Sequence, residues 1–209
     1  MKKAIKYLLV FLLVGLVGYK SVYFKKLSEV NKTAGQKFDA AAFSKKLWDE
    51  KLPARLDSAI ELTSLIRPIE INPVDAFAKY SNAIDIGNYR YSLVKVTGTA
   101  AVINENEIIM QVNHADSLMI VKLATEYIYG NAIRDASNLV NIKDFTNTTD
   151  LNSISEELNK TVRTTVLPPF KKNIKQGNKI EVTGAIEMNK EHIKLNELEL
   201  IPVRVKILQ

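Results

Sequence analysis

Two segments centred on the same Val-Thr-Gly triplet constrain most strongly what this chain can fold into. The first, Asn88 to Ile103, reads NYRYSLVKVTGTAAVI, and its triplet returns as Val182-Thr183-Gly184 in NKIEVTGAIEM. Apolar and polar residues alternate in both segments, which is typical of β-strands. A glycine in mid-strand allows a sharp bend, so that the two halves of a small barrel can share the strand. We therefore assign structural roles to Gly98 and Gly184.

The order of the other expected elements indicates the fold. Two strands follow the first glycine-centred strand, Glu107 to Val112 and Ser117 to Leu123. The next element is a helix, Leu151 to Val166, with apolar residues three and four apart. One strand, His192 to Leu208, follows the second glycine-centred strand. We read Tyr127 to Ile133 as a further short strand, Ser153 with Glu156 as a capping box, and Pro168-Pro169 as the end of the helix. Three strands, a helix and two strands is the order of an OB-type barrel.

The segment before the barrel reads as helical. Asp39 is expected to cap a first helix, Pro53 to interrupt it and start a second over Leu52 to Ile66, and Asn72-Pro73 to start a third. Trp48 is spaced with Phe43 and Leu47 along one helix face, which favours core packing; stacking on a ligand is the alternative. The predicted fold class is thus α+β: an OB-like five-stranded β-barrel, residues 88–209, preceded by a helical segment, residues 38–87, and with a helix between strands 3 and 4.

The first 26 residues predict a membrane anchor. Lys2, Lys3 and Lys6 precede an apolar run from Tyr7 to Tyr19, as in a signal sequence, but no small-x-small cleavage site follows. The run is shorter than the roughly 20 residues that span a bilayer, unless Lys20 snorkels. We favour an uncleaved single-pass anchor, residues 1–26, over a cleaved secretory signal. Residues 27–37 would form a tether, with the bulk of the chain on the periplasmic or extracytoplasmic side of the cytoplasmic membrane.

Charge outside the anchor argues against a nucleic-acid partner. The chain carries 29 basic and 23 acidic residues, but six of the lysines lie in residues 1–26, which hold no acid, so 23 basic residues remain against 23 acidic ones. These basic residues are dispersed rather than gathered into a run, whereas nucleic-acid binding needs a basic footprint. An OB-type nucleic-acid binder stays as an alternative function.

The candidate ligand-binding residues are Arg134, Asp135, Tyr89, Tyr91 and Tyr127. A guanidinium next to a carboxylate can clamp a hydroxylated ligand, and the tyrosines offer rings for stacking, as OB barrels use them. A structural ion pair that orders the neighbouring loop is the alternative for Arg134 and Asp135.

No catalytic, metal or cofactor site is assigned. His114, Asp116 and His192 include residue types that bind metals, but nothing in the sequence brings the two histidines together, and a polar hairpin corner is favoured. Serine nucleophiles lack a base, phosphate-binding glycine loops are absent, and no two acids stand out as a hydrolytic pair. We therefore expect a protein that is not an enzyme, with an unrecognised hydrolase as the alternative.

A set of longer segments carries a family resemblance: FDAAAFSKKLWDEKLP, YSLVKVTGTA, NAIRDASNLVNIKDFTNTTDLNSISEELN, VLPPF and IEVTGA. Together they resemble a bacterial family of predicted periplasmic lipoproteins of unknown function, whose genes tend to lie beside those of sugar ABC transporters. The resemblance covers Phe38 to Met188 and implies an OB-like barrel. Many members carry a lipobox cysteine after the signal; this chain has no cysteine, so the apolar segment takes its place. The implied role is an accessory of an ABC uptake system that binds a protein partner or a small sugar.

Overall fold

The two glycine-centred segments form neighbouring strands. The computed structural model describes residues 5, 7, 38–84, 86–115, 117–196 and 198–208, and residues 39–209 make up one of its two compact units, to which all that follows refers. Within it, β2 (Tyr89–Ile103) and β5 (Lys179–Asn189) pair antiparallel. Val96 lies opposite Val182, so the repeated triplets meet in the middle of the barrel wall.

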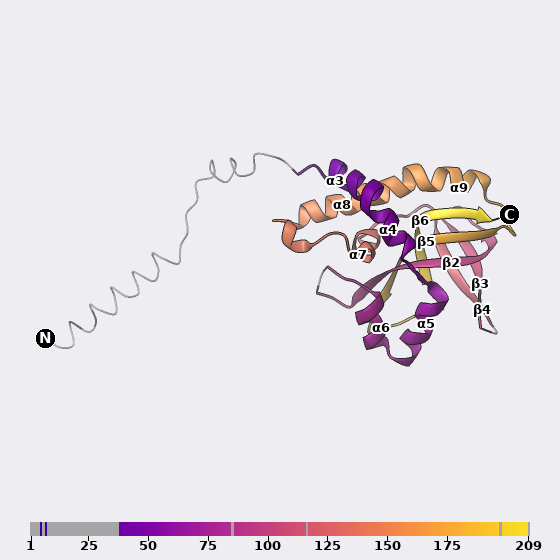
Figure 1. Ribbon diagram of the computed structural model, residues 1–209, viewed down its shortest axis with the longest axis horizontal. Coiled ribbons are helices and arrows are strands. Elements are labelled where there is room, and N and C mark those ends of the chain that lie inside the picture. Colours follow the sequence, from indigo (N-terminus) through magenta and orange to yellow (C-terminus); the bar gives the residue numbers. More distant parts are fainter. Residues whose placement is uncertain are drawn as a thin grey trace. The chain divides into compact units, whose positions relative to one another are not determined.

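Three more strands close the ring, in the order β2-β3-β4-β6-β5 with β2 pairing again to β5 (Figure 1). They are β3 (Glu107–His114), β4 (Ser117–Ala124) and β6 (Leu198–Leu208). β4 and β6 run parallel and pair only between residues 121–123 and 198–200; the other neighbours in the ring are antiparallel. A two-residue strand that the sequence did not predict, β1 (Ile60–Glu61), adds parallel to β2.

The barrel interior is built from the apolar residues of the alternating pattern. Val94, Val96 and Ala100 of β2 are fully buried, as are Ile180, Val182 and Ile186 of β5. Val102 falls on the same face if the alternation of β2 continues, but it is 45% exposed. The register of β2 against β3 shifts between Ala100 and Val102; such a β-bulge re-aims the side chains that follow it.

Helices lie along part of the barrel wall (Figure 1). Before it come α3 (Ala40–Lys46), η1 (Leu47–Lys51), α4 (Leu52–Asp57), α5 (Leu62–Ile71) and α6 (Pro73–Tyr80). Between β4 and β5 come α7 (Ala132–Ser137), η2 (Ile142–Asp144), α8 (Thr148–Thr161), η3 (Val162–Val166) and α9 (Leu167–Asn173). The short strand expected over Tyr127 to Ile133 is wrong, because that stretch is irregular up to the start of α7.

Two helix breaks predicted at prolines are also wrong. α3, η1 and α4 follow one another without a gap through Pro53, and α8, η3 and α9 do the same through Pro168 and Pro169. In both cases a π-helical turn, η1 or η3, precedes the proline-bearing segment. A proline lacks the N–H of a helix interior and its ring crowds the preceding turn. A wider turn just before the proline relieves that crowding, so each helix continues past its proline instead of ending there.

Two predicted helix caps are confirmed. Asp39 accepts a hydrogen bond from the Ala42 N–H, and Asn72 accepts one from the Asp75 N–H. The helix predicted over Leu151 to Val166 was started too late, since α8 begins at Thr148 and its cap is Asn147, whose side chain accepts from the Asp150 N–H. The second helix begins at Leu52 as predicted, with Pro53 in its first turn, but it ends at Asp57 instead of Ile66, and α5 begins only at Leu62.

Candidate functional site

Arg134 and Asp135 form a buried ion pair. Both belong to α7 and are 2% exposed, with Arg134 Nε 2.6 Å from Asp135 Oδ1. The guanidinium also donates to the Leu151 carbonyl at 3.1 Å, which ties α7 to α8. On α7's other side, Arg55 donates to the Ser137 carbonyl at 2.8 Å. Side chains so enclosed offer no surface to a ligand, and the geometry is that of the structural ion pair considered from the sequence.

Tyr91 extends this polar cluster onto the barrel. It lies opposite Glu187 across the β2–β5 ladder, so that its hydroxyl and the Glu187 carboxylate influence each other's pKa. Burial, with the charges of Glu187 and Asp135, raises the pKa of Tyr91 above its ordinary value. Burial likewise raises the pKa of Glu187, with smaller contributions from Glu199 and Asp135, while the Tyr91 hydroxyl opposes the shift. The cluster therefore holds its protons more tightly than free side chains would.

The other two candidate tyrosines are exposed and belong to different parts of the chain. Tyr89 begins β2, whereas Tyr127 lies in the connection between β4 and α7. No aromatic ring contact within the described part of the chain joins them to each other or to Tyr91. In that same connection, Tyr129 lies under the Arg163 guanidinium at 5.4 Å from the ring centre.

The residues weighed for a metal do not form a group in the structure. His114 ends β3 and His192 lies between β5 and β6, while Asp116 is outside the described residues. Among the residues that the structure describes, no three His, Cys, Asp or Glu side chains are grouped so that they could hold a metal ion.

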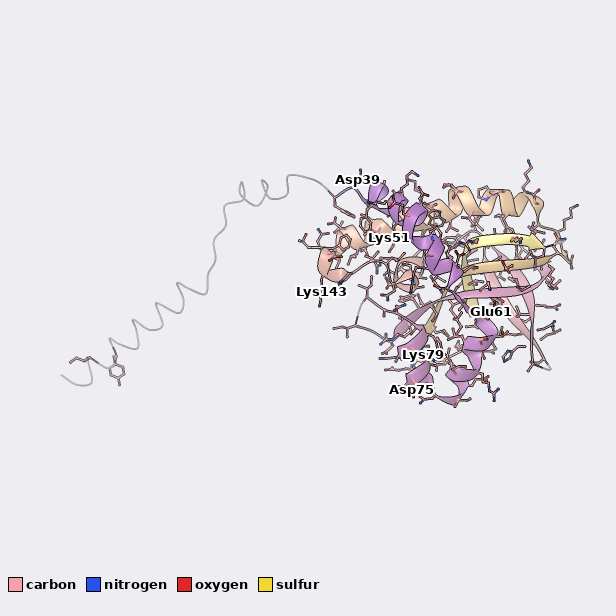
Figure 2. The ribbon with its side chains drawn as sticks, viewed as in Figure 1. Asp39, Lys51, Glu61, Asp75, Lys79 and Lys143 are labelled. Carbon is pink, nitrogen blue, oxygen red and sulfur yellow. The ribbon has the colours of Figure 1, made fainter. Side chains whose placement is uncertain are left out.

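An open groove lies between α5 and α6. It has a volume of about 710 Å³, and its lining includes Asp75 and Lys79 of α6, which are labelled in Figure 2. Ile71, at the end of α5, lines it and is 74% exposed; Val74, just beyond the hairpin turn, is 76% exposed. Sequence reasoning placed a helix start at Asn72-Pro73 but did not single out the apolar residues that flank it. Two apolar residues around a tight turn were the signal that could have drawn attention to this hairpin.

The outer face of β3 and β4 carries no aromatic side chain. The outward positions are Ile109, Gln111 and Asn113 on β3 and Leu118, Ile120 and Lys122 on β4, and neither strand contains Phe, Tyr or Trp. OB barrels that bind single-stranded nucleic acid stack its bases on aromatic side chains of this region.

The comparisons with known proteins are consistent with this geometry. A family described as predicted periplasmic lipoprotein, DUF2291, matches residues 12–206. The chain belongs to this family. The chain contains no cysteine. A search of curated proteins found no match.

Solved structures show the fold. A crystal structure of an OB-fold protein from Thermotoga maritima is 23% identical, covers 83% of this chain and 100% of its own, and superposes with a TM-score of 0.71. The predicted α+β fold with an OB-like barrel is thereby confirmed. The Stn1–Ten1 complex of S. pombe overlaps much less, with 15% identity, 56% of this chain, 58% of its own and a TM-score of 0.27.

The predicted membrane anchor falls on residues 1–26, of which only Ile5 and Tyr7 are described. Within the described ranges, no helix has the length and the apolar character needed to cross a bilayer.

Proposed function

We propose that this member of the family is a non-catalytic accessory protein, held at the outer face of the cytoplasmic membrane by residues 1–26, that binds a protein partner of an ABC uptake system. The observation that carries the proposal is the α5–α6 groove with its exposed apolar hairpin turn. The link to an uptake system rests on the gene neighbourhood of the family that the sequence resembles.

The size and exposure of the apolar residues suit a protein interface. Covering a fully exposed Ile or Val side chain is worth about 1.5 to 3 kcal/mol each. Ile71 and Val74 lie close together around the turn between α5 and α6, so one partner surface can cover both. Apolar centres with polar rims are typical of protein interfaces.

The charges around the groove favour a protein over a nucleic acid or a lipid surface. Arg67 and Lys79 line the groove together with Asp75, so positive and negative charges both occur at its rim. A phosphate-rich partner would require a uniformly basic surface, and an anionic membrane would attract basic residues alone. Mixed charges instead match the alternating charges of another folded protein.

The test is site-specific photocrosslinking in cells. A photoreactive phenylalanine analogue at Ile71 in the full chain should crosslink to a subunit of an ABC transporter or to its extracytoplasmic binding protein. The substitution Val74→Glu, combined with the crosslinker at Ile71, should reduce the crosslinked product about tenfold, because a charge would be buried in the interface.

The matched control is Ile86→Glu. Ile86 is a fully exposed apolar residue in the connection between α6 and β2 and does not line the groove. That variant should leave the crosslink unchanged. A crosslink to unrelated abundant proteins only, or one that Val74→Glu and Ile86→Glu weaken equally, would overturn the proposal.

A further inference from the structure

A second pocket, of about 500 Å³, lies between the first helical stretch and the α8–η3 helix. In Figure 1, α3 lies beside α8, and the pocket opens where these helices continue into their π-helical turns. One wall carries Lys45, Trp48 and Asp49, and the other carries Glu157, Thr161 and Thr165. Its volume is in the range of pockets that enclose small molecules, roughly 300 to 1,000 Å³.

Trp48 is the aromatic wall of this pocket and the only tryptophan of the chain. Helical spacing from Phe43 and Leu47 favoured core packing for all three. In the structure Leu47 is buried, whereas Trp48 is only partly covered. The π-helical turn η1 begins at Leu47, so Leu47 anchors the helix to the protein while the indole next to it lines the pocket.

The charged groups of the pocket are already paired. Lys45 Nζ lies 2.5 Å from Asp49 Oδ2, and Lys160 Nζ lies 3.2 Å from Glu157 Oε2. With each carboxylate balanced by an ammonium group, no net charge remains to select an ionic ligand. Each carboxylate can still accept further hydrogen bonds, since its two oxygens have about four acceptor sites between them.

The threonines add to these hydrogen-bond acceptors. The Thr161 hydroxyl donates to the Glu157 carbonyl at 2.9 Å, and the Thr165 hydroxyl donates to the Thr161 carbonyl at 2.6 Å. Their single protons are used, so towards the pocket they accept. The lining is therefore rich in acceptors around one flat apolar ring, which suits a molecule with several hydroxyl donors and one apolar face.

We propose that this pocket binds a neutral polyhydroxylated ring, of the monosaccharide class. The ring lays its C–H face on the Trp48 indole and donates hydroxyl hydrogen bonds to Asp49 and Glu157. The site is separate from the α5–α6 groove and does not depend on the proposed protein partner.

The single tryptophan makes the site directly observable. Intrinsic fluorescence of the full-length protein in detergent reports Trp48 alone, because the chain has no second tryptophan. Titration with ribose, glucose, galactose and myo-inositol should give a saturable change of emission with at least one of them. Glu157→Gln should weaken that binding about tenfold, because a hydrogen bond to a charged group is worth more than one to a neutral group.

Glu156→Gln is the matched control. Glu156 is the preceding residue of α8, pairs with Arg163 at 2.6 Å and does not line the pocket; its substitution should leave the titration unchanged, and circular dichroism should show both variants folded. Three results would overturn the proposal: no saturable response of the folded protein to any of the four probes, an equal loss in both variants, or a response to choline instead, which would indicate a cation site. None of these outcomes depends on the crosslinking result.

Discussion

At the scale of single residues, Gly98 and Gly184 stand where a side chain has no room. A Cβ atom on Gly184 would lie 2.1 Å from the Ile201 carbonyl oxygen, and one on Gly98 would lie 2.6 Å from that of Gln111. Both obstacles are backbone atoms of the neighbouring strand, which cannot rotate away. Neither glycine has a positive φ, so close approach of the backbones, and not an unusual conformation, is what requires glycine here.

We predict that Gly98→Ala and Gly184→Ala each lower the free energy of unfolding by about 1 to 3 kcal/mol, with the larger loss at Gly184 because its contact is shorter. Gly98→Val and Gly184→Val should cost more. Urea denaturation of the purified protein measures the difference.

Gly87→Ala serves as the control, since nothing lies within 4 Å of the position of its Cβ. It should leave the free energy of unfolding nearly unchanged. Equal stability of all three alanine variants would mean that the strands can move apart at no cost, contrary to the close approach seen here.

At the scale of elements, two titratable side chains, Tyr91 and Glu187, face each other across the β2–β5 ladder. The pKa of Glu187 is raised from its ordinary 4.5 and that of Tyr91 from its ordinary 10.0. A raised pKa means that the folded state binds the proton more tightly than the unfolded state does. Each group therefore contributes stability that is present below its ordinary pKa and is lost as the pH rises through the folded value. Both effects lower the stability as the pH rises, the one from Glu187 above its ordinary pKa of 4.5 and the one from Tyr91 above its ordinary pKa of 10.0.

We predict that Tyr91 ionises only well above pH 10 in the folded protein. The difference between the alkaline absorbance titrations of the wild type and of Tyr91→Phe isolates its phenolate. Glu187→Gln should move this titration to lower pH, because a negative charge next to the hydroxyl is removed.

Glu181→Gln is the matched control, as Glu181 lies on the same strand opposite Thr97. That variant should leave the Tyr91 titration in place. A difference titration centred near pH 10 in the wild type would contradict the raised pKa expected for the half-buried Tyr91 beside Glu187.

At the scale of the whole molecule, the predicted location of the chain rests on the family description and on the first residues. The family description calls its members predicted periplasmic lipoproteins. Lys2, Lys3 and Lys6 before the apolar run should stay in the cytoplasm by the positive-inside rule, while Lys25 and Lys26 oppose this orientation weakly.

We predict that a periplasm-active reporter fused after Gln209 is active and that mass spectrometry of the membrane-bound protein finds residues 1–26 retained. An inactive fusion in membranes that contain the protein would show that the orientation is the opposite of the predicted one. A mature protein that begins near Ser21 would replace the anchor by a cleaved signal.

The sequence by itself determined the barrel. Strand alternation, the paired glycines and the order of three strands, a helix and two strands are local patterns, and a register error of one residue would turn every apolar side chain outward. For the same reason most of the buried face of this helix was predictable: Leu151, Ile154 and Leu158 of α8 and Val162 of η3 are buried, whereas Val166, the next residue of the same spacing, is only partly covered.

Only the tertiary structure decided where the candidate site residues lie. The sequence offered two roles for Arg134 and Asp135, and they are enclosed because α4, α8 and the barrel all pack against α7. It expected breaks at Pro53 and Pro168, yet both helices continue through π-helical turns. The exposure of Ile71 and the partial exposure of Trp48 likewise depend on which other elements pack against them. Burial is a property of neighbours that are distant in sequence, so no local pattern could have decided it.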